Sequence, residues 1–164
     1  MSIARTVERY LIQNKIPYDL MSHPYTETSR QSAHVMHVPA EQVAKAVVLE
    51  DEIGYLMVVI PSTHYLMLNT IRKYLNRDMQ LTNEPQLRQL FRDCVVGAIP
   101  PLGPAYGIET LIDKSLTEQP DIYFEAGDHQ GILHVSTNRF LELLGFPSQG
   151  YFSHRTRSHA EQAV

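Results

Sequence analysis

Two apolar, β-branched runs separated by a short polar turn constrain the fold most. Residues Ala44 to Glu50 and Tyr55 to Ile60 are rich in valine, leucine and isoleucine, and only residues 51–54 lie between them. Runs of this kind are typical of strands, and a parallel crossover needs about a dozen residues. The pattern therefore predicts an antiparallel hairpin, which Pro61 closes.

Helical and strand patterns alternate along the rest of the chain. Apolar residues recur at helical spacing from Ile3 to Leu11 behind a potential cap at Ser2, and Ser136 precedes a last helix that ends at Gly145. Several strand candidates follow one another closely, which favours a mixed or mainly antiparallel sheet. Further helices are expected around Ala33 to Met36, after a cap at Asn69 and after a cap at Asn83, and further strands at Tyr18 to His23, Cys94 to Val96, Glu109 to Ile112, Ile122 to Glu125 and Ile132 to Val135.

Length and composition indicate one core. The 164 residues are 43% hydrophobic, which is enough apolar material for one well-packed domain. We expect a single compact α/β (α+β) domain over residues 1–147, with a curved, mixed and largely antiparallel sheet flanked by helices. Beyond Pro147 the pattern ends, and residues 148–164 are expected to form a polar, frayed tail.

Charge and hydropathy exclude several classes of protein. No run reaches the roughly 18 apolar residues of a membrane-spanning helix, and the N-terminus lacks the apolar core of a secretory signal, so we expect a cytoplasmic protein without membrane contact. A net charge of -4 argues against indiscriminate binding to nucleic acid. Candidates for a local basic patch are Arg72, Lys73 and Arg77 on one predicted helix and Arg88 and Arg92 on the next, although solvated helix faces show the same pattern. Cys94, the single cysteine, is expected to be a buried, inert thiol.

Lys45 is the first candidate for chemistry, because it opens an otherwise apolar strand. An ammonium group at a pocket edge can neutralise a phosphate or polarise an ester carbonyl, and partial desolvation strengthens both effects. The alternative interpretation is a strand-end lysine that extends to water.

The loop from Gly97 to Gly103 is the second candidate. Pro100 and Pro101 fix its path, and the flanking glycines allow a close backbone approach. A rigid concave turn of this kind can present N-H groups, including those of Ala98 and Ile99, to an oxyanion or carbonyl oxygen. A purely structural corner between strands explains the same residues.

Histidines supply the third candidate. The segment from Ala126 to Gly131 places Gly127 and His129 in a turn between two strands, and His23 ends an earlier strand. A histidine there can act as a base or donor, although it can equally be an exposed loop residue. Eight histidines are present, but no HExxH or paired CxxC occurs, and the phosphate-binding glycine motifs are absent. We expect no metal and no cofactor.

In order along the chain, these pieces resemble the YbaK/prolyl-tRNA synthetase-associated domain family. The likeness spans roughly Ile3 to Leu144. Its marks are the stretch His23 to Ala33, Val43-Ala44-Lys45 opening a hairpin, the Val96 to Gly103 loop, Ile112-Asp113, and Ala126-Gly127-Asp128-His129.

The resemblance implies a free-standing deacylase that hydrolyses the ester of mischarged aminoacyl-tRNA, with mischarged tRNA(Pro) as the expected substrate. Lys45 would hold the carbonyl or the nearby 3'-terminal phosphate. His23, Gly97, Ala98, Ile99, Pro100 and Gly103 would line the aminoacyl pocket, which Gly127 and His129 would close. Water would be the nucleophile, with help from the substrate's 2'-hydroxyl.

Several alternatives stay open. The esterified amino acid could be alanine, cysteine, serine or threonine, because an apolar pocket separates single methylenes by only about 1 to 3 kcal/mol. A synthetase or elongation factor could be a partner, and the chain could be a monomer or a homodimer. The same fold could instead be a non-catalytic module that binds a tRNA end, a nucleotide or a synthetase, or a hydrolase of small esters or amides.

Overall fold

The predicted hairpin forms the centre of the molecule in the computed structural model, which describes residues 3–156. Strand β2 (Ala44–Glu50) pairs antiparallel with β3 (Tyr55–Pro61), so that Lys45 lies opposite Ile60. They belong to a five-stranded sheet of order β5-β2-β3-β6-β9. β6 (Glu109–Asp113) runs parallel to β3, β9 (Gln149–Gly150) parallel to β6, and β5 (Gln80–Leu81) antiparallel to β2.

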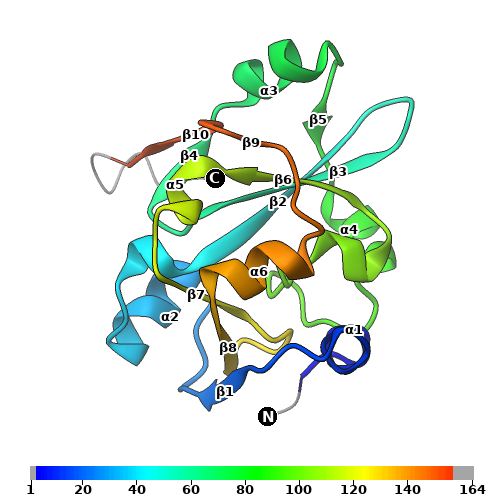
Figure 1. Cartoon of the computed structure of the whole chain (residues 1–164). Coiled ribbons are helices and arrows are strands. Elements are labelled where there is room, and N and C mark those ends of the chain that lie inside the picture. The colour runs from blue at the N-terminus through cyan, green and yellow to red at the C-terminus, as the bar shows by residue number, and fades with distance from the viewer. Residues whose placement is uncertain (1–2, 157–164) are drawn as a thin grey trace.

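Two smaller antiparallel sheets complete the strands. The first has the order β1-β8-β7 and lies below the five-stranded sheet in Figure 1, and a parallel bridge from Val43 to Tyr123 connects the two. The second pairs β4 with β10 at the upper edge. The bounds are β1 (Asp19–Ser22), β4 (His64–Leu66), β7 (Asp121–Glu125), β8 (Gly131–Ser136) and β10 (Ser153–Arg155).

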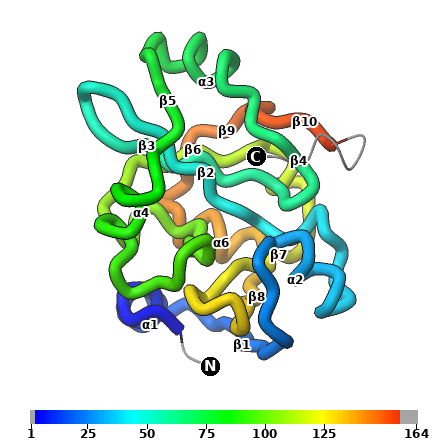
Figure 2. The backbone as a smooth tube through the Cα atoms, turned by 180° about the vertical axis from the view of Figure 1, so that it is seen from behind, coloured from blue at the N-terminus to red at the C-terminus, as the bar shows by residue number. Residues whose placement is uncertain are grey.

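Helices cover both sides of this arrangement. In Figure 1, α3 lies above the five-stranded sheet, whereas α6 lies between the two larger sheets on the near side; the view from behind in Figure 2 shows α2 beside β7. This arrangement confirms the predicted fold class. The bounds are α1 (Arg5–Asn14), α2 (Ser29–Met36), α3 (Leu68–Leu75), α4 (Glu84–Leu90), α5 (Lys114–Thr117) and α6 (Thr137–Leu143), with short 3-10 turns at Ala40–Gln42 and Gly103–Tyr106.

The alternation of side chains along β2 explains the two main cores. Ala44 and Val48 join the large apolar cluster between the two sheets, whereas Leu49 joins a second cluster beneath α3. Because successive strand residues point to opposite faces, Lys45 shares the face of Val47 and Leu49. A strand that is apolar on both faces is thus explained by its position between two cores.

The predicted helix caps are confirmed where the capping side chain accepts a hydrogen bond from an amide of its own helix. Asn83 and Ser136 cap α4 and α6 as predicted, with bonds to the amides of Gln86 and Arg139. The predicted cap at Asn69 is wrong, because α3 begins at Leu68 and Met67 occupies the cap position. Ser2 lies outside the described residues.

The predicted strand at Cys94 to Val96 is wrong. These residues form a turn after α4, in which the amide of Cys94 donates to the carbonyl of Phe91. The side chains of Val95 and Val96 are 46% and 49% exposed, so this apolar run does not mark a buried strand.

The predicted frayed tail is also wrong over residues 148–156. Phe152 is buried beneath α3, and its amide donates to the carboxylate of Asp113 at 2.9 Å. Strands of two and three residues show no periodicity in a sequence, which is why the expectation failed. Residues 157–164 lie outside the described part of the chain.

Candidate functional site

Lys45 lies at the start of β2 and is half-buried. Burial lowers the pKa of its ammonium group to about 8, and the positive charge of Arg30 contributes in the same direction. Of the two interpretations that the sequence leaves open for this lysine, partial desolvation fits this lowered pKa. A lysine with this pKa is still mostly protonated at neutral pH.

A small cavity of about 110 Å³ adjoins Lys45. Its wall comes from the N-terminal end of α2, the start of β2, the β3–β4 connection, β4 and the residue that follows β10. The guanidinium of Arg30 donates to the hydroxyl of Thr156 at 3.1 Å, which fixes one side of the wall. The lining residues are Thr28, Ser29, Arg30, Lys45, Ser62, Tyr65 and Thr156.

Asp113 holds the outer part of this wall in place. Its carboxylate accepts from the hydroxyl of Ser153 at 2.7 Å, and Ser153 is 2.8 Å from Nδ1 of His64. These contacts tie β10 to β4, the strand that carries Tyr65. Asp113, part of the Ile112-Asp113 motif of the family resemblance, thus stabilises the wall of the cavity.

The Gly97 to Gly103 loop is packed rather than open. Gly97 has a φ of +82°, and a Cβ added at Gly103 would lie 1.9 Å from the hydroxyl oxygen of Thr110. The amide of Ala98 donates to the carbonyl of Val95 at 3.0 Å, so it is not available to an oxyanion. Pro100 and Leu102, two residues of the loop, are buried.

The candidates Gly97, Gly127 and His129 lie together in one corner of the fold. The carbonyl of Val96 accepts from Nε2 of His129 at 2.6 Å, and the same imidazole lies 3.4 Å from the position of a Cβ at Gly97. His129 has a φ of +63° and is only 3% exposed, with the ring of Tyr25 at 5.1 Å. Gly127, with a φ of +120°, leaves room for Ala4.

His23 lies on the buried side of this corner. Its amide donates to the carbonyl of Gln130, and its Nδ1 donates to the carbonyl of Pro24 at 2.7 Å. Beside it is Glu125, a buried carboxyl that accepts from the hydroxyl of Ser32 at 2.9 Å and whose pKa is raised by burial. Glu125, the last residue of β7, was not among the predicted site residues, although a carboxyl at the end of an apolar run was a usable signal.

Lys45 and the Gly97 loop line different cavities. Gly97 and Ile99 border a more apolar cavity of about 380 Å³ that also contacts α4 through Leu87 and Phe91. The structure thus brings Gly97, Gly127, His129 and His23 into one corner and leaves Lys45 beside Arg30 and Tyr65. Arg30 and Tyr65 were not predicted, because only the tertiary structure places them there.

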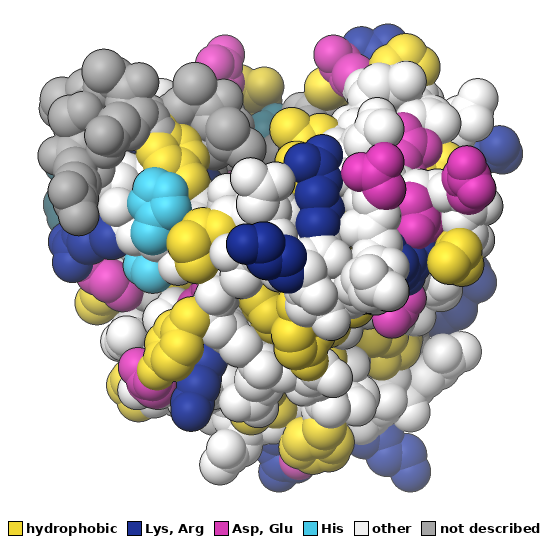
Figure 3. All heavy atoms as spheres, turned by 90° about the horizontal axis from the view of Figure 1, so that it is seen from above, with side chains coloured by type: hydrophobic (Ala, Val, Ile, Leu, Met, Phe, Trp, Pro, Cys, Tyr) yellow, Lys and Arg dark blue, Asp and Glu magenta, His cyan; other side chains and the backbone are white. Residues whose placement is uncertain are grey.

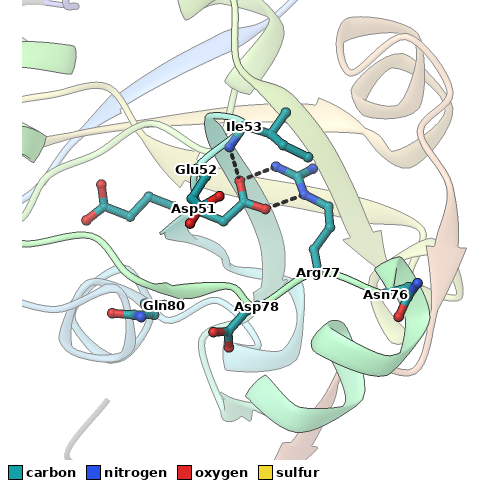
Figure 4. A pocket seen from close by; sticks show the side chains of 8 residues that line it. Asp51, Glu52, Ile53, Asn76, Arg77, Asp78 and Gln80 are labelled. Carbon is teal, nitrogen blue, oxygen red and sulfur yellow. Dashed lines mark hydrogen bonds and ion pairs between the residues drawn. The ribbon is translucent and has the colours of Figure 1, made fainter.

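Another cavity lies at the far end of β2 and is acidic. It measures about 610 Å³ and is bordered by the hairpin turn and the segment after α3. Figure 4 shows Arg77 directed at Asp51, with guanidinium-carboxylate distances of 2.6 and 2.7 Å. From above (Figure 3), acidic side chains gather on the right, the side of the hairpin turn. This cavity repels rather than attracts phosphate.

Three of the arginines considered for a basic patch have local partners. Arg72 donates to the carbonyl of Met79, Arg77 pairs with Asp51 and Glu109, and Arg88 pairs with Glu84. The reading as helix faces with local partners therefore holds for them.

Several other chemistries find no support in the described residues. Burial raises the pKa of the Cys94 thiol to about 12, so it is not a nucleophile at neutral pH. Within residues 3–156, no three histidine, cysteine or carboxylate side chains are grouped as metal ligands. The helices in that range are too short or too polar to span a bilayer.

Solved structures resemble this chain over nearly its whole length. A scaffold protein for the presentation of grafted epitopes matches with a TM-score of 0.82 and 16% identity, covering 93% of this chain and 97% of its own. A candidate trans-editing enzyme for prolyl-tRNA synthetase matches with a TM-score of 0.79 and 19% identity, covering 93% and 97%. A candidate signal transduction protein from Marinobacter aquaeolei VT8 matches with a TM-score of 0.75 and 19% identity, over 93% of this chain and 31% of that one. At these identities the likeness shows the fold.

The family follows from the sequence. Curated proteins give no match. A family model described as the aminoacyl-tRNA editing domain matches residues 23–143, a span that contains Lys45, the Gly97 loop and His129. The chain belongs to the aminoacyl-tRNA editing domain family.

Proposed function

We propose that this protein is a trans-editing deacylase that hydrolyses the ester bond of mischarged aminoacyl-tRNA, with mischarged tRNA(Pro) as its substrate. The observation that carries the proposal is Lys45, a half-buried cation beside a polar cavity in a chain of the editing family. Family membership supports tRNA editing in general. The resemblance to a candidate editing enzyme for prolyl-tRNA synthetase supports the choice of tRNA(Pro).

In this mechanism, water attacks the ester carbonyl and the terminal ribose of the tRNA leaves with its hydroxyl restored. Lys45 binds the end of the substrate through its positive charge, which partial burial makes more effective. The Gly97 loop and His129 form the wall for the aminoacyl side chain, because their rigid backbone loses little entropy on binding. The substrate's 2'-hydroxyl helps to activate the water.

The partner and compartment follow from this substrate. The acceptor end of aminoacyl-tRNA is the ligand, and the charge of -4 makes help from a synthetase or elongation factor reasonable. Such a protein would work in the cytoplasm, as a monomer or homodimer, without a metal or cofactor.

A non-catalytic binding module is the alternative, and one observation favours it. The Nε2 of His129 and the amide of Ala98 are both engaged by backbone carbonyls, so neither offers a base or an oxyanion donor in this conformation. Such a module would bind a tRNA end, a nucleotide or a synthetase without turnover.

A panel of charged tRNAs separates these functions. Purified protein is mixed with tRNA(Pro) carrying proline, alanine, cysteine, serine or threonine, and release of the amino acid is followed. The proposal expects the protein to hydrolyse at least one mischarged tRNA(Pro) and to leave prolyl-tRNA(Pro) intact. Tight binding without release would establish the binding module, and equal rates on free aminoacyl esters would establish a small-ester hydrolase.

A further inference from the structure

One histidine joins all three strands of the sheet β1-β8-β7. His134 lies on the central strand β8, directly opposite Asp19 on β1 and Tyr123 on β7. Its Nδ1 is 3.0 Å from Oδ2 of Asp19, and its Nε2 is 2.8 Å from Oδ1 of Asp121 on β7. Each ring nitrogen therefore faces a carboxylate, and the two carboxylates belong to different neighbouring strands.

This geometry is complementary to a protonated ring. A carboxylate only accepts hydrogen bonds, and a neutral imidazole carries a single N-H, so a neutral His134 would donate to one carboxylate and present a lone pair to the other. An imidazolium donates to both. The ring of Tyr123 is stacked on the imidazole, with the centroids 4.6 Å apart and an interplanar angle of 17°, and the face of an aromatic ring attracts a cation.

The pKa of His134 is shifted in the direction that this geometry requires. Partial burial lowers the pKa, but the hydrogen bonds and negative charges of Asp121 and Asp19 outweigh burial and raise the pKa above its ordinary value. Because the folded value exceeds the unfolded one, the stabilisation is complete below an unfolded value of about 6.5 and is lost as the pH rises through the folded value. The link between the strands is thus strongest on the acidic side of neutrality.

Strand β1 depends on this link more than β7 does. β1 has four residues, three of which are exposed, and within residues 3–156 it pairs only with β8. β7 also forms a bridge from Tyr123 to Val43, and it buries Ile122 and Phe124 in the main core. A short, exposed edge strand has little buried surface to hold it, so losing one cross-strand contact loosens it first.

β1 continues directly into the corner that contains His129. The amide of His23, the residue after β1, donates to the carbonyl of Gln130 at 2.8 Å, and the amide of Thr26 donates to the carbonyl of His129 at 3.2 Å. Between them, the ring of Tyr25 lies 5.1 Å from the ring of His129. The segment after β1 therefore forms one side of the corner, and its position depends on how firmly β1 is held.

We propose that His134, as an imidazolium, is a positioning residue for the corner formed by His23, Gly127 and His129, and that this corner loosens when His134 loses its proton. His134 acts through β1 and touches no substrate. The effect on catalysis rests on the proposed deacylase function, whereas the effect on the order of the corner does not.

Amide hydrogen exchange tests the link without any substrate. The exchange rates of the His23 and Thr26 amides in His134→Gln are divided by the wild-type rates at the same pH, which cancels the intrinsic pH dependence of exchange. We expect a ratio of about fivefold at about pH 6, the size of a favourable charged pair, and a ratio near one at about pH 9. His34→Gln, the same change at an exposed position of α2, should match wild type at both values.

His134→Arg separates the charge from the shape of the side chain. An arginine stays protonated, so this variant should exchange as slowly as wild type at about pH 6 and more slowly than wild type at about pH 9. An exchange ratio near one for His134→Gln at about pH 6, or a raised ratio that does not change with pH, would overturn the proposal.

Kinetics show whether the link positions the substrate. At about pH 6, His134→Gln should raise the KM for mischarged tRNA about fivefold and leave kcat nearly unchanged, and the two proteins should converge at about pH 9. The ratio to wild type at each pH cancels the titration of Lys45. If exchange depends on His134 but KM does not, the positioning role is refuted. If wild type hydrolyses no ester, the deacylase proposal fails, and exchange alone still decides whether His134 controls the corner.

Discussion

The two ends of β2 differ in how the protein accommodates charged side chains beside an apolar strand. At one end, Lys45 is half-buried beside Arg30, at a cavity of about 110 Å³ whose lining includes no carboxylate among residues 3–156. At the other end, the turn carboxylate of Asp51 accepts from the amides of Ile53 and Gly54 and pairs with Arg77 around a cavity of about 610 Å³. The larger cavity is lined mainly by carboxylates, one of which pairs with Arg77, whereas the described residues that line the smaller cavity include two cations and no carboxylate.

This difference shows that the volume of a cavity alone does not identify a functional site. The bonds of Arg77 hold the pKa of Asp51 well below its usual range and raise that of Arg77, which means that both groups are stabilised in their charged forms. Burial instead holds the pKa of Lys45 below its usual range, which means that its charged form is destabilised in the free protein. A group that is kept at a cost to stability is a better candidate for function than one that stabilises the fold.

The pH dependence of activity should show the largest effect at the Lys45 end. Because the pKa of Lys45 is about 8, its protonated fraction falls about tenfold per pH unit above that value. Enzyme-catalysed deacylation, corrected for spontaneous alkaline hydrolysis, should fall about a hundredfold by pH 10. Lys45→Arg, which stays charged, should be less active at pH 7 but lack this fall. A wild-type rate that is flat from pH 7 to 10 would show that the charge of Lys45 is not used.

Neutral substitutions should change stability in opposite directions at the two ends. The folded pKa of Lys45 lies below its unfolded value, so the unfolded chain binds more protons between about pH 8 and 10.5, and stability rises with pH over that range. Lys45→Met should therefore raise the free energy of unfolding at pH 7 by on the order of 2 kcal/mol, and this gain should shrink toward pH 10. Arg77→Met should lower it. Urea denaturation measures both, and a destabilised Lys45→Met protein would contradict the account.

Deacylation activity should be least sensitive to substitutions at the end of β2 that adjoins the hairpin turn. Arg77→Gln removes the ion pair with Asp51 but touches no residue of the Lys45 cavity. Its kcat/KM on mischarged tRNA should stay within about twofold of wild type at a temperature where the variant is folded. A tenfold loss in folded protein would mean that the large acidic cavity takes part in substrate binding.

The sequence predicted what local patterns encode. The hairpin followed from two apolar runs, and the caps at Asn83 and Ser136 followed from residue type. Long-range pairing was not accessible in the same way. β9 and β10 are too short to show a period, and the apolar run at Cys94 to Val96 is a turn.

The same distinction between local patterns and long-range contacts applies to the site residues. Each candidate was chosen for its local chemistry, and the structure groups Gly97, Gly127, His129 and His23 in one corner. Tyr65 and Arg30 reach Lys45 only because β4 and α2 meet at the start of β2. No local pattern marks such a junction, so the composition of the cavity wall could not be predicted.

The most direct test of the account is deacylation of mischarged tRNA(Pro) by Lys45→Ala beside Lys73→Ala. Lys73 is an exposed lysine on α3 outside the Lys45 cavity, and its replacement controls for the loss of one positive charge. We expect kcat/KM to fall by at least about a hundredfold in Lys45→Ala, the size seen when one charge-stabilising group is removed from an active site, and to stay near wild type in Lys73→Ala. Equal activity of Lys45→Ala and wild type would contradict the claim that Lys45 is the centre of the site.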